Sequence, residues 1–181
     1  AANPAQPLSD VMAGTESGNR MNLETFVQRN YMENILCDAN RRFRDMSNGQ
    51  FELKLINVED AGEGKNKGLD LEVYSIVTGK TRSVNTLSGG ESFMAALSLA
   101  LGMADQIQAA TAAIHLDVMF IDEGFGSLSD NARNEAVNIL KEMAGKQRQI
   151  GIISHVSELK DEIENQLIVK KDDRGSHISW R

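Results

Sequence analysis

Residues 116–123 (LDVMFIDE) decide the fold: a short apolar run that ends in two acidic residues. Such a run is typical of a buried strand in a parallel sheet, and ligands bind at the carboxyl ends of these strands. Asp122 is placed to hold Mg²⁺, directly or through water, and Glu123 to orient an attacking water as general base. The alternative is a strand that simply ends in solvated acids.

The segments that follow predict a strand–helix–strand unit. A helix over 130–144 has its inner face at Ala132, Ala136, Ile139, Leu140 and Met143, and a second apolar strand over 150–154 ends at His155. His155 should reach the same sheet edge as Asp122, where a neutral imidazole could hydrogen-bond a γ-phosphate, although a histidine at a strand end is usually structural. In the linking turn, 124–130 (GFGSLSD), Ser129 or Asp130 could simply cap the helix.

A third segment, 87–91 (LSGGE), has the spacing of a capping box between Ser88 and Glu91. Its glycines, Gly89 and Gly90, are poor helix formers, but they let a phosphate approach the backbone N–H groups at the positive end of a helix dipole. The alternative is a plain cap on a buried helix, since residues 93–104 (FMAALSLALGMA) are apolar nearly all round.

The rest of the chain predicts an α/β protein. We expect a flexible lead-in or linker over 1–20, a long amphipathic helix over 21–47 stopped by Asn48-Gly49, and strands over 51–55 and 69–73. A turn at 78–81 leads to a further strand, so that 51–85 form an antiparallel portion. A short helix over 157–164 and a hairpin of 167–171 with 177–180 follow.

Composition narrows the class of protein. The 181 residues fit a single domain, and the net charge of -7 argues against a surface that grips nucleic acid all over. The single cysteine, Cys37, excludes a disulfide framework. We expect no membrane segment, because no apolar run approaches the roughly 20 residues that a spanning helix needs. Because a single cysteine suits a reducing compartment, we also expect a cytoplasmic location.

In this order, the segments resemble an ABC-class ATPase. LSGGE resembles the signature motif, VMFIDEGF the Walker B motif, GSLSD the D-loop and ISHV the H-loop. IDEGFGSL, where transporters usually have proline after the glutamate, is similar to the SMC-like DNA-repair branch, specifically the C-terminal ATPase lobe of the SbcC family. Residues 33–53 (ENILCDANRRFRDMSNGQFEL) resemble the point where the returning coiled coil of that family enters the head. The resemblance covers residues 23–171.

The resemblance implies the C-terminal lobe of an ABC-type head: a mixed sheet, flanking helices and a long N-terminal helix from the coiled-coil base. It implies ATP and Mg²⁺ as cofactors, with two heads sandwiching two ATP molecules. Asp122 (for Mg²⁺), Glu123 and His155 would complete the site of their own head. The residues assigned to ATP binding, with the signature residues reaching the opposite head, are Ser88, Gly89, Gly90, Glu91 and Asp130.

Two departures from the family pattern stand out. Ser129 occupies the place where the D-loop usually has aspartate, and Asp130 follows it. No GxxxxGK[ST] motif is present: Gly79-Lys80-Thr81 mimics its tail, but Tyr74 stands where the first glycine is required, and GEGKNKG (62–68) fails on register. We therefore expect residues 21–181 to be half of a split head, inactive without an N-terminal Walker A lobe. The other implied partners are a second head, an SbcD-type nuclease and double-stranded DNA ends.

Two other interpretations stay open. A metal-dependent nuclease could draw ligands from Asp117, Asp122, Glu123, Asp130, His115 and His155. A non-catalytic structural or DNA-binding head fragment, SMC-like or RecN-like, could use a basic set to contact phosphates: Arg41, Arg42, Arg44, Lys54, Lys65 and Lys67. The plain alternative for these arginines is a solvated helix end. Cys37, His115, His177 and Trp180 suggest no special role.

Overall fold

The computed structural model describes residues 23–57, 69–110, 116–144, 148–173 and 175–181. The lead-in expected over 1–20 and the GEGKNKG segment lie outside these residues. The chain divides into two compact units, Ala1–Leu116 and Asp117–Arg181, and each is described by itself.

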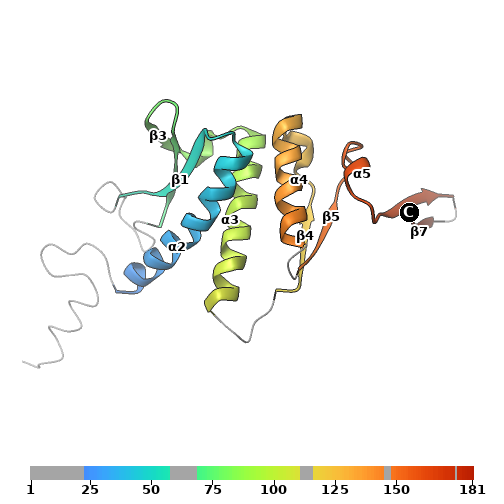
Figure 1. Ribbon diagram of the computed structural model, residues 1–181, viewed down its shortest axis with the longest axis horizontal. Helices are drawn as coiled ribbons and strands as arrows, with labels where there is room; N and C mark the ends of the chain where they lie inside the picture. The colour runs from blue at the N-terminus through green and yellow to red at the C-terminus, as the bar shows by residue number, and fades with distance from the viewer. Residues whose placement is uncertain (1–22, 58–68, 111–115, 145–147, 174) are drawn as a thin grey trace, which may run out of the picture. The chain divides into compact units, whose positions relative to one another are not determined.

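Two long helices dominate the first unit. Helix α2 (Leu23–Met46) and helix α3 (Gly89–Ala110) lie side by side (Figure 1). They approach closely at Gly102, where an added Cβ would stand 2.7 Å from the carbonyl oxygen of Ile35 and 3.0 Å from the amide nitrogen of Ala39. Helix α2 ends as predicted, because Asn48 (φ 52°) and Gly49 (φ 73°) turn the backbone into the left-handed region.

The two halves of α2 differ in burial. Ile35, Ala39 and Phe43 are buried in the C-terminal half, whereas the apolar side chains of the first two turns and Tyr31 are about half exposed. The 3.6-residue pattern therefore predicted the helix correctly, and only its C-terminal half packs into the core of this unit.

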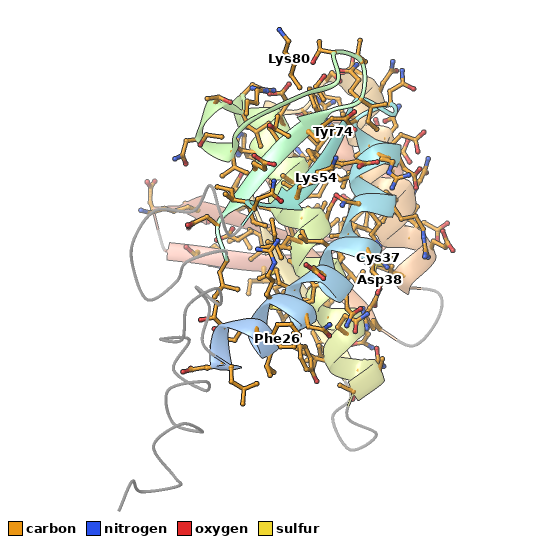
Figure 2. All side chains as sticks on the ribbon, turned by 90° about the vertical axis from the view of Figure 1, so that its left-hand side faces the viewer. Phe26, Cys37, Asp38, Lys54, Tyr74 and Lys80 are labelled. Carbon is orange, nitrogen blue, oxygen red and sulfur yellow. The ribbon has the colours of Figure 1, made fainter. Side chains whose placement is uncertain are left out.

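An antiparallel sheet completes the first unit, formed by β1 (Phe51–Leu55), β2 (Leu71–Ser75) and β3 (Lys80–Ser83) in that order. The second strand begins two residues later than predicted. Gly79, at φ 69°, makes the hairpin turn, and Lys80 and Thr81 begin β3, so Gly79-Lys80-Thr81 leads from a turn into a strand and is not a phosphate-binding loop. Figure 2 shows Lys80 at the tip of this hairpin, and Lys54 beside Tyr74, whose ring centroid lies 3.5 Å from the Lys54 Nζ.

A side chain of α2 joins the helix to this sheet. Asn40 Nδ2 donates to the carbonyl oxygen of Leu53 at 2.8 Å, and the Leu53 N–H donates to Asn40 Oδ1 at 2.7 Å. The amide thus pairs with buried backbone groups of β1 as a neighbouring strand would.

Helix α3 corrects one expectation. Its 22 residues contain an 18-residue window with a mean hydropathy of 1.2, so by length and composition alone the sequence does contain a stretch that could cross a membrane. The core helix of a soluble protein passes the same test. Leu97, Ser98 and Leu101 of α3 are buried, and its polar residues Asp105 and Gln106 bond to α2.

The second unit contains the strand–helix–strand segment. Strands β4 (Val118–Asp122) and β5 (Gln149–Ile153) pair in parallel, with Asp122 opposite Ile153, and helix α4 (Asp130–Ala144) connects them. The expected burial of both strands is wrong for this chain, because Val118, Phe120 and Ile153 are more than half exposed. The strand type and pairing follow from the local pattern, whereas burial depends on what covers the sheet.

The last elements are the short helix α5 (Leu159–Glu162) and the predicted hairpin of β6 (Leu167–Asp172) and β7 (Gly175–Trp180). The described strands form three small sheets rather than one. The mixed α/β class is confirmed.

Candidate functional site

The signature segment (87–91) opens helix α3 with the reciprocal contacts of a capping box. The Ser88 N–H donates to Glu91 Oε2 at 2.8 Å, and the Glu91 N–H donates to Ser88 Oγ at 3.3 Å. Ser88 and Gly89 are exposed, and the N–H groups of the first helical turn have no partner within the helix. The Ser88 hydroxyl, Gly89 and Gly90 are therefore placed to meet an anion from solvent.

Arg82 of β3 adds a charged partner that the spacing of the motif did not reveal. Its Nη1 donates to the Thr86 carbonyl oxygen at 2.7 Å, and its Nη2 lies 3.4 Å from Glu91 Oε2. Partial burial would raise the pKa of Glu91, but hydrogen bonds from Ser88 and the charge of Arg82 outweigh it and lower that pKa below its ordinary value of 4.5.

The Walker B segment (118–123) ends in an unusual backbone conformation. Asp122 is the exposed last residue of β4, and Glu123 follows at φ 59°, in the left-handed region that non-glycine residues seldom adopt. Gly124 continues at φ 98°, and the Glu123 N–H is anchored on the Ile153 carbonyl oxygen at 2.8 Å. Backbone strain of this kind, about 1 kcal/mol, persists where the surroundings fix it and is frequent at functional sites.

The structure brings Glu123 and His155 together. His155 Nδ1 lies 2.8 Å from Glu123 Oε2, in contact across the carboxyl ends of β4 and β5. The side chain of His155 is 81% exposed and that of Glu123 is 47% exposed, so a ligand has free access to both. With Nδ1–H on the carboxylate, a neutral ring offers Nε2 only as an acceptor; donating to a phosphate requires the ring to be protonated or released from Glu123.

The D-loop segment (126–130) is held by its own side chains. Ser129 Oγ accepts from the Ala132 N–H at 3.4 Å, which makes Ser129 the capping residue of α4. Asp130 is exposed, and Arg133 joins it to the loop, because Nη1 lies 3.2 Å from Asp130 Oδ1 and Nη2 donates to the Leu128 carbonyl oxygen. Asp130 is thus available at the surface, with one oxygen near Arg133.

The acidic and histidine side chains of the described residues were the candidate metal ligands. Within the described residues, no three His, Cys, Asp or Glu side chains converge on a common point, and His115 lies outside that part of the chain. Two-metal hydrolysis needs several converging ligands. Mg²⁺ is commonly bound by one or two carboxylates with water and substrate phosphates, and the exposed Asp122 can supply one such carboxylate.

The arginines considered for DNA contacts all have acidic neighbours. Arg42 Nη2 lies 2.5 Å from Asp105 Oδ2, Arg44 Nε 3.0 Å from Glu52 Oε1, and Arg41 Nη2 3.8 Å from Asp38 Oδ1. In each pair, the carboxylate competes with a DNA phosphate for the guanidinium group. Lys65 and Lys67 of the same set lie outside the described residues.

Comparisons with known proteins agree with this geometry. Residues 66–142 match the family model described as SbcC/RAD50-like, Walker B motif. The SbcC subunit of the SbcCD nuclease from Vibrio cholerae is 45% identical over 172 residues, covering 94% of this chain and 17% of that protein. The Lactococcus lactis protein of the same name is 40% identical over 169 residues, covering 91% and 16%. The chain therefore spans about a sixth of the curated relatives it matches.

Solved structures match over most of the chain. One, from work on ATP-driven dimerization and DNA-stimulated activation of SMC ATPases, has a TM-score of 0.65 at 18% identity and covers 87% of this chain and 89% of its own. An Smc head bound to the C-winged helix domain of ScpA gives 0.65 at 21% identity, covering 87% and 45%. The fold matches that of SMC ATPase heads, and together with the SbcC/RAD50-like Walker B match over residues 66–142 and the SbcC relatives it supports a C-terminal SbcC-type lobe of an ATPase head.

Proposed function

We propose that this chain is the C-terminal half of an SbcC-like ATP-hydrolysing head, which becomes active when an N-terminal Walker A lobe of the same protein joins it. The contact between Glu123 and His155 carries the proposal. It places a carboxylate and an imidazole together where β4 and β5 end, next to Asp122. In the assembled head, Asp122 would hold Mg²⁺, Glu123 would orient the attacking water and accept its proton, and His155, once its ring is released from Glu123, would contact the γ-phosphate.

The signature segment serves a second head. Ser88, Gly89 and Gly90 present a hydroxyl and N–H groups at the exposed start of α3, which suits the γ-phosphate of ATP bound to an opposing head. Glu91 supports that turn, and Asp130 lies exposed at the start of α4. ATP then holds two heads together, and its hydrolysis releases them, as a ligand biases a two-state equilibrium.

The names of the relatives support a role of the whole protein in DNA processing with a nuclease partner. They are components of a nuclease, so we place the whole protein in the cytoplasm with an SbcD-type nuclease, processing double-stranded DNA ends in repair and recombination. The nuclease chemistry belongs to that partner, because this chain has no converging metal ligands among its described residues.

Two binding experiments test the split site. Calorimetric titration of Mg-ATP into the 181-residue chain should give weak or undetectable binding. The reason is that no Walker A lysine is present to hold the β- and γ-phosphates. Co-expression with the Walker A lobe should restore ATP-dependent dimerisation and turnover. Micromolar binding with turnover by the chain alone contradicts the proposal.

Variants of the assembled head separate the roles of the two segments. Glu123→Gln should abolish turnover yet retain a stable ATP-bound dimer, because the isosteric amide cannot accept the proton of the attacking water. Glu158→Gln, which alters an exposed acid of the same unit, is the matched control and should behave as the unsubstituted head. Ser88→Arg should prevent dimerisation while the fold stays intact, as measured by circular dichroism. Normal dimerisation by Ser88→Arg would remove the signature segment from the mechanism.

A further inference from the structure

Arg82 connects the antiparallel sheet to the start of helix α3. It stands on β3, and its guanidinium lies 5.4 Å from the centroid of the Phe51 ring. One arm, Nη1, is fixed on Thr86, whose carbonyl oxygen and Oγ1 accept at 2.7 and 3.1 Å. The other arm, Nη2, reaches Glu91 Oε2 at 3.4 Å. Contacts on both arms and the nearby Phe51 ring hold the charge in one place.

Glu91 presents an electrostatic difficulty at this position. Its carboxylate lies in the first turn of α3, three residues after Ser88, and the same Oε2 atom accepts from the Ser88 N–H. A negative charge there stabilises the helix dipole, but it also repels a triphosphate that approaches Ser88, Gly89 and Gly90. A nearby cation reduces this repulsion without disturbing the cap.

We infer that Arg82 is a positioning residue of the signature segment, which neutralises Glu91 and holds its carboxylate on the Ser88 N–H. This rests on the proposed function, in which the segment contacts ATP bound to a second head. With Glu91 Oε2 bound by both Ser88 and Arg82, the Ser88 hydroxyl proton and the N–H groups of Gly89 and Gly90 are the groups presented to the phosphate. Arg82 itself acts through Glu91 and does not contact the nucleotide.

A purely structural role for Arg82 makes different predictions. If the residue only fastened β3 to the turn at Thr86, the planar fork would matter more than the charge, and Arg82→Lys would be nearly as harmful as Arg82→Gln. Removing the charge of Glu91 would then bring no recovery. If neutralisation matters, Arg82→Lys keeps most of the function, and Glu91→Gln compensates for Arg82→Gln, because glutamine still accepts from the Ser88 N–H.

The test measures the ATP concentration that gives half-maximal dimerisation of the two-lobe head, by sedimentation. The parent carries Glu123→Gln, so that ATP is not consumed. Arg82→Gln should raise this concentration about tenfold, the effect of losing one charge-assisted contact. Arg82→Lys and the double variant Arg82→Gln with Glu91→Gln should both stay within about threefold of the parent. The matched control is Arg44→Gln, which removes another Arg–Glu ion pair of the same unit and should have no effect.

Each outcome decides between the alternatives. If Arg82→Gln dimerises like the parent, the inference is wrong while the proposed function stands. If Arg82→Lys is as weak as Arg82→Gln and the double variant does not recover, Arg82 is only a structural link, and the inference is again wrong. If the parent does not dimerise at millimolar ATP, the proposed function fails and the inference fails with it. Circular dichroism of every variant confirms that the measured shifts come from folded protein.

Discussion

Replacing Gly102 with alanine tests the close approach between helices α2 and α3. A Cβ at this position would stand 2.7 Å from the Ile35 carbonyl oxygen, 3.0 Å from the Ala39 nitrogen and 3.2 Å from the Ala39 Cβ. Two of these atoms belong to the backbone and cannot rotate away. The helices must therefore separate to admit one methyl group.

Two opposing effects set the magnitude. Forcing an extra carbon into a closely packed helix contact costs roughly 1–3 kcal/mol. Alanine returns about 1 kcal/mol, because it is a better helix former than glycine. The separation also stretches the contact between Arg42 and Asp105, which joins the same two helices. We expect a net loss of about 1 kcal/mol in the free energy of unfolding.

The assay is urea unfolding of the 181-residue chain followed by circular dichroism. With a slope of about 2 kcal/mol per molar urea, the midpoint should fall by roughly 0.5 M. Gly151→Ala is the matched control. Its Cβ would come even closer to a neighbour, 2.6 Å from the Phe120 ring, but that ring is 72% exposed and can turn aside. We expect a change within about 0.5 kcal/mol for the control.

Two results would refute the reasoning. A midpoint that rises for Gly102→Ala, as helix propensity alone predicts, would mean that the two backbones do not meet as described. A larger loss for Gly151→Ala than for Gly102→Ala would mean that the Phe120 ring is held in place and that the distinction between backbone and mobile side-chain neighbours is wrong.

Three further changes give sharp readouts. Asn40→Ala should cost about 2–3 kcal/mol in urea unfolding and speed amide exchange at Leu53, because buried backbone groups of β1 lose both partners; unchanged exchange would contradict this. Because the folded-state pKa of Glu91 is lowered, its contribution to stability is present above pH 4.5 and disappears as the pH falls through that lowered value. The stability difference between Glu91→Gln and the unsubstituted chain should therefore shrink from about pH 7 to about pH 3, and a constant difference would contradict the lowered pKa of Glu91. Glu123→Asn should leave the thermal midpoint unchanged or raise the stability by up to about 1 kcal/mol, since asparagine tolerates the left-handed backbone better; a clear drop would count against strain at Glu123.

Local features of the fold could be predicted from the sequence because their causes are local. The cap formed by Ser88 and Glu91 and the stop at Asn48-Gly49 depend on residues close to each other in the chain. The meeting of Glu123 and His155 is a longer-range result, but it follows from one rule: parallel neighbouring strands bring their carboxyl ends to the same edge.

The features that the sequence did not predict depend on what surrounds a residue in the fold, or on contacts that no sequence pattern marks. The apolar run predicts that the side chains of Val118 and Phe120 are suited to burial. Their actual exposure depends on whether another layer of structure covers the sheet. The contacts of Arg82 with Glu91 and of Asn40 with Leu53 carry no local signal, since these partners lie 9 and 13 positions away and an arginine or asparagine has many alternative roles. A basic residue on a strand shortly before an LSGGE segment is the one hint that could have pointed to Arg82.

The close backbone contact at Gly102 also makes α2 a lever arm acting on the signature segment. Because the two helices meet without an intervening side chain, a tilt imposed on α2 is transmitted to α3 as a rigid rotation and is not absorbed by rotamer changes. From Gly102 to Gly89 the helix rises about 20 Å, so a tilt of about 5° would carry the start of α3 through roughly 1.7 Å. A displacement of that size is comparable to the margin between a made and a broken phosphate hydrogen bond. Mechanical load on one helix could thus be converted into a change in nucleotide affinity at the far end of the other.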